Sequence, residues 1–153
     1  MLRGEKVIVT GATGRLASPV ARALCEDNEV WALARFRDPA QRGALEDLGI
    51  TCVTKDLVAD PLDDLPDDVT RVFHAGAIVY TAGSEQDFAY TFELNAQATA
   101  RLMYRFRRVR TFVHCSTGGV YAHQSRPIVE SDPYGVMIPA YSLSKIAAEH
   151  LVI

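Results

Sequence analysis

The sequence predicts a doubly wound parallel α/β sheet with the strand order 3-2-1-4-5. Short runs rich in β-branched residues alternate with longer amphipathic stretches, which is the pattern of strand–helix–strand crossovers. A glycine-rich turn, in VIVTGATGRLA at Val7 to Ala17, directly follows the first apolar run. Gly11, Asp56 and Thr117 then fall at the carboxyl ends of strands, which is the edge where such sheets bind ligands.

The predicted elements follow one another without an internal repeat or an interdomain linker, so we expect one domain over residues 1–153. The strands are expected at 6–10, 29–34, 50–54, 69–75 and 111–116. Helices are expected at 16–26, 39–48, about 86–106 and around Tyr141, and the acidic segment 56–68 should hold one helical turn at most. The first helix should bury Leu16, Val20, Ala23 and Leu24.

Composition restricts the class of partner. The chain has 153 residues, of which 48% are hydrophobic and 23% charged, enough for one domain with a core. A net charge of -3 gives no electrostatic reason to bind nucleic acid or an anionic membrane, so a small-molecule partner is expected. No apolar run is long enough for a membrane span, and the first residues lack a signal-peptide pattern, so we expect a cytoplasmic location.

Cysteines, histidines and clustered arginines receive structural interpretations. Cys25, Cys52 and Cys115 lie in apolar surroundings without metal-ligand spacing, which indicates reduced core thiols. The four histidines form no ligand motif. Five arginines at the end of the long helix should face solvent and complement the helix dipole rather than bind nucleic acid: Arg101, Arg105, Arg107, Arg108 and Arg110.

The glycine turn is typical of a dinucleotide site. Gly11 allows a tight bend, Gly14 allows the backbone to approach a pyrophosphate, and Ala17 stands where helix and strand pack closely. The helix that begins there directs free N–H groups and the positive end of its dipole at the phosphates. Cofactor contacts are also expected from Thr13, Arg15 and Leu16. The alternative is a strand-to-helix turn that binds no ligand.

The end of the second strand discriminates between cofactors. An acidic residue there would bind the adenosine ribose 2′-OH of NAD, but Ala34 is followed by Arg35, with Arg37 nearby and Arg15 in the turn. Because cations favour a 2′-phosphate, the sequence predicts NADP over NAD. Arg35 could alternatively be only a solvated strand end.

Tyr141 and Lys145 in AYSLSK stand one helical turn apart, so their side chains share a helix face. A tyrosine acts as a base near neutral pH only if its pKa falls from about 10 toward 7, and a neighbouring ammonium favours the phenolate. The pair therefore predicts acid–base chemistry on an alcohol or ketone. The competing interpretation is a partly buried aromatic beside a solvated lysine.

Six segments, in order, resemble the extended short-chain dehydrogenases/reductases, also called the NAD-dependent epimerase/dehydratase family. Two departures are that Ala17 replaces the third glycine and Gly76 replaces the usual alanine. The segments are TGATGRLA, KDL at Lys55 to Leu57, VFHAGA at Val72 to Ala77, NAQAT from Asn95, CSTGGVYA from Cys115, and AYSLSK.

The resemblance implies a Rossmann-like fold, an NAD(P)-dependent oxidoreductase, epimerase or dehydratase, and a hydroxyl or keto substrate such as a nucleotide sugar. It implies that Tyr141 exchanges the substrate proton, Thr117 hydrogen-bonds the reacting oxygen, and Lys145 lowers the tyrosine pKa and holds the nicotinamide ribose. It adds Asn95 to the catalytic set and implies a homodimer paired through the Asn95 and Tyr141 helices. Further cofactor contacts are implied for Asp56, Leu57, Ala75, Gly76, Ala77 and Ser116.

The chain stops at Ile153 within IAAEHLVI, an amphipathic pattern without a glycine or proline stop signal. Members of the resembling family continue into a C-terminal substrate-binding region, so we expect a fragment of a longer enzyme that lacks that region. The alternative function is a binding module that senses NAD(P) without turning over a substrate.

Overall fold

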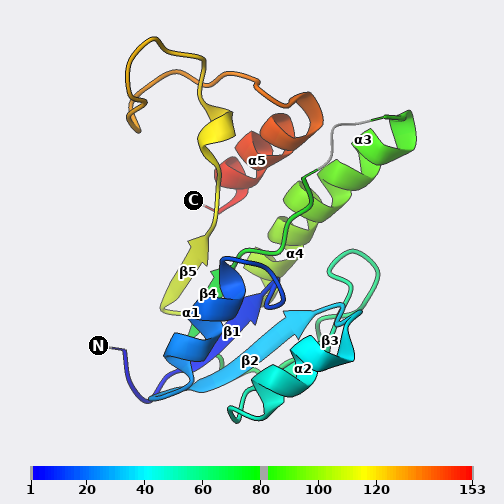
Figure 1. Ribbon diagram of the computed structural model, residues 1–153, viewed down its shortest axis with the longest axis vertical. Helices are drawn as coiled ribbons and strands as arrows, with labels where there is room; N and C mark the ends of the chain where they lie inside the picture. Colours follow the sequence, from blue (N-terminus) through cyan, green and yellow to red (C-terminus); the bar gives the residue numbers. More distant parts are fainter. Residues whose placement is uncertain (1, 80–82, 153) are drawn as a thin grey trace. The chain divides into compact units, whose positions relative to one another are not determined.

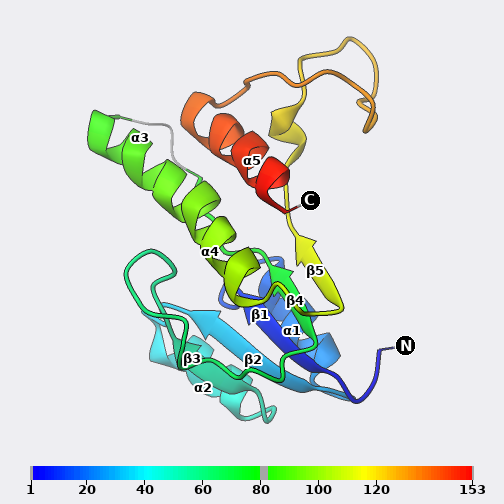
Figure 2. The ribbon, with the colours of Figure 1, turned by 180° about the vertical axis from the view of Figure 1, so that it is seen from behind.

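The computed structural model describes residues 2–79 and 83–152. Within them five parallel strands form one sheet in the order β3-β2-β1-β4-β5, which confirms the predicted topology (Figures 1 and 2). The strands are β1 (Lys6–Thr10), β2 (Glu29–Ala34), β3 (Thr51–Thr54), β4 (Arg71–His74) and β5 (Thr111–His114). The first two have the predicted bounds, and the other three are slightly shorter than predicted.

Helices connect successive strands in the predicted order, except between β3 and β4. Asp38 caps α2 by accepting a hydrogen bond from the Ala40 N–H at 2.9 Å, and Pro39 supplies the fixed first residue. Ser84 caps α3 in the same way. The helical segments are α1 (Ala17–Leu24), α2 (Pro39–Glu46), α3 (Glu85–Phe92), the π-helical η1 (Glu93–Gln97), α4 (Ala98–Arg105), the 3₁₀ turn η2 (Gly118–Val120) and α5 (Pro139–Leu151).

The described residues group into two compact units. The first contains residues 2–76 and 104–115, and therefore the whole sheet with α1 and α2. The second contains residues 77–79, 83–103 and 116–152, with α3, η1, most of α4, η2 and α5. One domain over the whole chain stays a prediction.

The core of the first unit lies between the sheet and the helices α1 and α2. Alternate strand residues, such as Val7 and Val9 of β1, face these helices because side chains alternate along a strand. Small residues predominate on the helix side, which lets the backbone of α1 approach the sheet closely. The buried cluster is Val7, Val9, Ala12, Ala17, Ala21, Val30, Ala32, Leu45, Ile50 and Cys52.

The predicted buried face of α1 was wrong. Leu16 precedes the helix and is 57% exposed, and Ala23 is exposed, whereas Ala17 and Ala21 are fully buried. The two buried alanines stand four residues apart, on one helix face. A helix that begins immediately after a tight glycine turn can lie close to the strand only through such small side chains, so the bulkier Leu24 is only partly buried.

Residues 56–68 form turns without a regular helix or strand, as predicted. The expectation that Arg105 faces solvent was wrong. Its guanidinium donates to the carbonyls of Leu62, at 2.9 Å, and Leu65, and pairs with Asp67 at 2.8 Å. Arg105 therefore satisfies carbonyl groups that this irregular segment cannot pair within itself.

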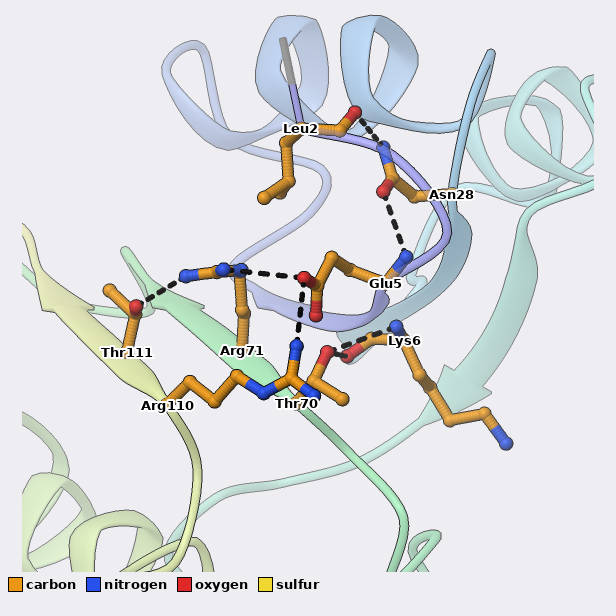
Figure 3. A network of polar contacts seen from close by, with 8 residues as sticks. All are labelled: Leu2, Glu5, Lys6, Asn28, Thr70, Arg71, Arg110 and Thr111. Carbon is orange, nitrogen blue, oxygen red and sulfur yellow. Dashed lines mark hydrogen bonds and ion pairs between the residues drawn. The ribbon is translucent and has the colours of Figure 1, made fainter.

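The amino edge of the sheet holds a network of charged and polar side chains (Figure 3). Glu5, just before β1, accepts from Arg71 of β4 at 3.3 Å and from Arg110, just before β5, at 3.2 Å. Arg71 also donates to the Thr111 hydroxyl. The Thr70 side chain and, with smaller effect, the two guanidinium groups lower the pKa of Glu5. One carboxylate thus joins the starts of three strands.

Candidate functional site

The glycine turn leaves β1 at Thr10 and bends back at Gly11, whose φ of +69° is a conformation that glycine adopts without strain. The Gly11 N–H donates to the Leu33 carbonyl at 2.9 Å, and the Gly14 N–H donates to the Gly11 carbonyl at 2.7 Å. A Cβ on Gly11 would lie 2.8 Å from the backbone N of Gly76. Gly11 is therefore required both by its conformation and by the close approach of Ala75 and Gly76, which follow β4.

The same contact joins the turn to the end of β4. The Gly76 N–H donates to the Thr10 hydroxyl at 3.1 Å, and that hydroxyl lies 2.6 Å from Nδ1 of His74. Gly76 is itself confined, since a Cβ there would lie 3.0 Å from Cδ1 of Leu57 and 3.2 Å from the Thr10 hydroxyl. The motifs at Gly11, Leu57 and Gly76, which are distant in sequence, meet at one sheet edge.

Between Gly11 and α1, the residues Thr13, Gly14, Arg15 and Leu16 are exposed. Leu16 offers no side-chain cap, so it leaves the first N–H groups of α1 to other acceptors. This arrangement suits the phosphate groups of a dinucleotide, which helix N-termini and bare glycine backbone bind through N–H donors. An open pocket of about 540 Å³ between α1 and α2 adjoins the turn and is lined by Arg15 and Arg22 among others.

Directly after β2, the exposed Arg35 and Arg37 stand on either side of the partly buried Phe36. Phe36 has a φ of +41°, which is unusual for a bulky residue and marks local backbone strain. Its ring packs against the core of the first unit, and the Arg42 guanidinium lies 5.8 Å from the ring centroid. Phe36 is held in this position while Arg35 and Arg37 remain exposed. Nothing in the sequence pattern indicated this conformation.

The carboxylate of Asp56 bonds the backbone of the turn that follows it: Oδ1 accepts from the Val58 N–H at 2.9 Å. The Asp56 N–H donates to Asp60 at 2.7 Å. Leu57 is 7% exposed, beside Gly76. Contacts of Asp56 and Leu57 with an adenine ring, and of Ala75, Gly76 and Ala77 with the cofactor, stay predictions.

The predicted catalytic side chains Thr117, Tyr141, Lys145 and Asn95 all belong to the second unit. Thr117 caps η2 by accepting from the Gly119 N–H at 3.2 Å. A Cβ on Gly119 would lie 3.6 Å from the Thr117 hydroxyl and 3.5 Å from the hydroxyl of Ser142. Thr117 therefore lies close to the residue that follows Tyr141 on α5.

Tyr141 and Lys145 lie on successive turns of α5, as their spacing predicts. Tyr141 is half-buried, whereas Lys145 is only 1% exposed. A lysine is almost never fully buried without polar partners, because removing an ammonium from water is costly. The interpretation of Lys145 as a solvated lysine is therefore wrong.

Asn95 lies in the π-helical segment η1, where the sequence predicted a continuous helix. Its Oδ1 accepts from the Ile78 N–H at 2.8 Å, and its Nδ2 donates to the Ile78 carbonyl at 2.9 Å and to the Ser144 hydroxyl at 3.0 Å. Both amide hydrogens are thus used, and Ser144 in turn donates to the Tyr141 carbonyl at 2.8 Å. These are the contacts of a residue that positions α5, and a catalytic role for Asn95 stays a prediction.

Ser116 is exposed, and its hydroxyl donates to the carboxylate of Glu149 on α5. The same carboxylate accepts from the Tyr134 hydroxyl at 2.9 Å, and this bond raises the pKa of Tyr134. Sequence reasoning missed both Glu149 and Tyr134. The available signal was spacing, because Glu149 follows Lys145 by four residues and Tyr141 by eight.

In the part of the chain that the structure describes, no helix is both long and apolar enough to cross a bilayer. The same residues contain no group of three or more histidine, cysteine or acidic side chains placed to hold a metal ion.

Comparison with known proteins gives a consistent result. Residues 7–153 match the NAD dependent epimerase/dehydratase family. A dTDP-4-dehydrorhamnose reductase of Burkholderia thailandensis is 34% identical over 146 residues, covering 94% of this chain and 44% of the relative. An uncharacterized UDP-glucose epimerase, YtcB of Bacillus subtilis, is 26% identical over 159 residues, covering 95% and 50%.

Among solved structures, UDP-glucuronic acid 4-epimerase from Bacillus cereus in complex with NAD superposes with a TM-score of 0.82. It is 26% identical, and the match covers 95% of this chain and 50% of the epimerase. The chain thus spans about half the length of the relatives it matches.

Proposed function

The chain belongs to the NAD dependent epimerase/dehydratase family, and from this premise we propose an NAD(P)-dependent oxidoreductase, epimerase or dehydratase that acts on a nucleotide sugar. The observation that carries the proposal is the full burial of Lys145 one turn from Tyr141 on α5. The proposal concerns the activity of the whole protein. Its cofactor is expected to bind the glycine turn that begins at Gly11, and its proton exchange to use Tyr141.

The proposed roles follow from the chemistry of the side chains. The Tyr141 phenolate takes the proton of a substrate hydroxyl, and the Thr117 hydroxyl hydrogen-bonds the same oxygen. The Lys145 ammonium favours the phenolate and binds a ribose hydroxyl. When bound, the nicotinamide ring supplies the hydride acceptor or donor. Epimerisation, dehydration and reduction of a sugar all share this proton and hydride exchange.

Nucleotide sugars are the proposed substrate class because the similar proteins are described as acting on or binding them: a dTDP-4-dehydrorhamnose reductase, a UDP-glucose epimerase and a UDP-glucuronic acid 4-epimerase. The test is a panel of UDP- and dTDP-linked sugars, assayed by NAD(P)H absorbance and by product analysis. Failure of the whole panel, with NAD(P) still bound, would favour the alternative of a non-catalytic NAD(P) sensor.

Replacing Tyr141 with phenylalanine tests the mechanism directly. Because general acid–base catalysis contributes roughly a hundred- to ten-thousandfold, we expect Tyr141→Phe to lower kcat by that order with cofactor affinity nearly unchanged. Thr117→Ala should likewise lower kcat more than it weakens cofactor binding. Tyr104→Phe is the matched control, since Tyr104 is 73% exposed on α4. Wild-type turnover by Tyr141→Phe would contradict the mechanism.

We also propose that the cofactor is NADP in preference to NAD. Support comes from exposed cations: Arg35 and Arg37 follow β2, and Arg15 lies in the glycine turn. In addition, the end of β2 carries Ala34 and Arg35 where an NAD-binding protein would carry an acidic residue for the ribose 2′-OH. Calorimetric titration with both cofactors tests this, with Arg35→Asp expected to reverse the order and Arg108→Asp, at an exposed arginine away from the turn, as control. NAD binding more tightly than NADP in the wild type would overturn the preference.

Two further expectations belong to the whole protein. Pairing through the helices that carry Asn95 and Tyr141 would give a homodimer, which sedimentation analysis tests. A cytoplasmic location is expected for an enzyme that uses NAD(P) and nucleotide sugars, and fractionation of the source cells tests it.

A further inference from the structure

The carboxylate of Glu149, on α5, bonds two other segments of the second unit, one at Ser116 and one at Tyr134. One carboxylate oxygen accepts from the Ser116 hydroxyl, and the other accepts from the Tyr134 hydroxyl at 2.9 Å. Ser116 immediately precedes Thr117. A single side chain on α5 therefore holds the segment that carries one proposed catalytic hydroxyl.

Glu149 lies on the same helix, α5, as the proposed catalytic residues Tyr141 and Lys145. Tyr141, Lys145 and Glu149 follow one another at intervals of four residues, so they form one stripe along the helix. The bond to Ser116 thus links the Thr117 segment to the same stripe that presents the tyrosine and the lysine. Two hydrogen bonds from hydroxyl donors to one ionised acceptor are stronger and more directional than bonds between neutral groups.

Tyr134 brings a second segment to the same carboxylate. Residues 121–135, here called the strap, leave η2 and return to it. The two ends of the strap meet through the Tyr121–Tyr134 bridge and the Ala122 N–H, which donates to the Pro133 carbonyl at 2.9 Å. The Tyr121 and Tyr134 rings stack with centroids 6.5 Å apart, and His150 of α5 lies 5.7 Å from the Tyr134 ring.

The two ends of the strap also approach each other closely at Gly135, whose N–H donates to the Val120 carbonyl at 2.9 Å. A Cβ on Gly135 would lie 2.3 Å from Cα of Ala122, so the two ends of the strap are in direct backbone contact. Fixing Tyr134 on Glu149 therefore fixes the whole base of the strap on α5. The side chain of Glu149 thus bonds both the Thr117 segment and the strap.

We propose that Glu149 is a positioning residue for the proposed reaction: it holds the Thr117 segment and the base of the strap at a fixed place on α5, acting through Ser116 and Tyr134. The proposal rests on the proposed function of Thr117 and Tyr141. Glu149 does not contact the reacting atoms; it determines where the Thr117 hydroxyl stands relative to the Tyr141–Lys145 face.

The first test is kinetic, on the protein with a nucleotide sugar that the wild type turns over. Since a misplacement of about 1 Å can cost roughly a hundredfold in rate, we expect Glu149→Ala to lower kcat on the order of tenfold or more. KM and the cofactor Kd should change less than kcat, because Glu149 is assigned no ligand contact of its own and only one implied cofactor contact, Ser116, depends on it. Glu149→Gln retains one acceptor oxygen and should recover part of the loss.

The matched control is Glu130→Ala, which removes an exposed carboxylate on the strap itself. It should leave kcat unchanged. Wild-type kcat in Glu149→Ala, or the same loss in the control, would overturn the proposal. If Glu149→Ala does not fold, Ser116→Ala and Tyr134→Phe replace it, and each should lower kcat less than the two substitutions combined.

Coupling separates a positioning role from a general loss of structure. With Glu149→Gln in place, adding Ser116→Ala should cost less than it costs in the wild type, because both changes remove the same bond. Strict additivity of the two losses would mean that Ser116 and Glu149 act independently, and would overturn the proposal.

The second readout does not depend on activity. Tyr134 faces Glu149, Tyr121 and His150, and the bond to Glu149 raises its pKa. An NMR titration with ring-labelled tyrosine, assigned with Tyr134→Phe, should show this pKa falling toward the ordinary value in Glu149→Gln. An unchanged Tyr134 titration, with normal wild-type turnover, would overturn the contact alone. If instead the Tyr134 pKa falls in Glu149→Gln but the wild type turns over no nucleotide sugar, the contact is real and the proposed function is wrong. The positioning role of Glu149 in catalysis would then be wrong as well.

Discussion

At the amino edge of the sheet charged side chains bind one another, whereas at the carboxyl edge glycines bring bare backbone together. Glu5 joins Arg71 and Arg110 across three strands at the first edge (Figure 3). At the second edge Gly11 and Gly76 stand in backbone contact, and the following turn is exposed. The difference teaches that side chains hold the first edge together, whereas close backbone packing and backbone hydrogen bonds hold the second.

Gly11→Ala should give the largest effect, because it breaks the carboxyl edge. The alanine Cβ would lie 2.8–2.9 Å from backbone atoms of Ala75 and Gly76, and it would stand at a φ of +69°. We expect a loss of roughly 2–4 kcal/mol in the free energy of unfolding. NAD(P) binding should be lost as well. Urea denaturation and calorimetry measure the two effects, and an unaffected Kd would contradict the assignment of this turn to the cofactor.

Glu5→Ala should break the amino edge without touching the other. It leaves Arg71 and Arg110 without their shared partner, in a network where Oε2 of Glu5 and Nε of Arg71 are already buried without a hydrogen bond. We expect the melting temperature to fall by several degrees while the Kd for NAD(P) stays unchanged.

Asp68→Ala is the control for that experiment. It removes the exposed pair between Lys6 and Asp68, whose carboxylate side chain is 71% exposed, and surface pairs of this kind contribute little. Its melting temperature should stay near that of the wild type. A fall in cofactor affinity for Glu5→Ala would show that the two edges are coupled, and would contradict the comparison.

Acid should weaken the amino edge selectively. The pKa of Glu5 is lowered in the folded protein, chiefly by the Thr70 side chain and then by Arg71 and Arg110. A group with a lowered folded pKa adds stability above its ordinary pKa, and that stability is lost as the pH falls through the folded value. Between about pH 7 and about pH 3 the wild type should therefore lose more stability than Glu5→Gln. Parallel losses in urea denaturation would contradict this origin.

Gly76→Ala should have the smallest effect and sharpens the comparison within the carboxyl edge. Its Cβ would meet the flexible end of Leu57 at 3.0 Å and the Thr10 hydroxyl at 3.2 Å, rather than rigid backbone as at Gly11. We expect a change of about 1 kcal/mol or less in the free energy of unfolding, with cofactor binding retained. A loss as large as that of Gly11→Ala would mean that Leu57 cannot move.

Much of the fold could be predicted because it depends on local periodicity. The alternation of apolar residues located β1 and β2 at their observed bounds, and the crossover rule gave the strand order. The start of α2 was predicted at Pro39, where the helix begins. The buried face of α1 could not be predicted, because the choice between Leu16 and Ala17 depends on how closely the helix approaches the sheet.

The types of residue at the candidate site could be predicted, whereas the backbone conformations around them could not. Tyr141 and Lys145 followed from their spacing, and Gly11 from its place after β1. The strained Phe36 and the π-helical turn at Asn95 depend on contacts with the core and with Ile78, which no local pattern encodes.

The sequence by itself determined the parallel α/β class and the spacing of the phenol and the ammonium, because both depend on short periodicities along the chain. The strand order followed from the alternation of strands and helices together with the handedness of crossover connections. Only the tertiary structure decided that Lys145 is buried, that Glu5 joins three strands and that Glu149 bonds both Ser116 and Tyr134. Those pairings join residues far apart in sequence, and the energy of such contacts exists only once the chain has brought them within hydrogen-bond distance.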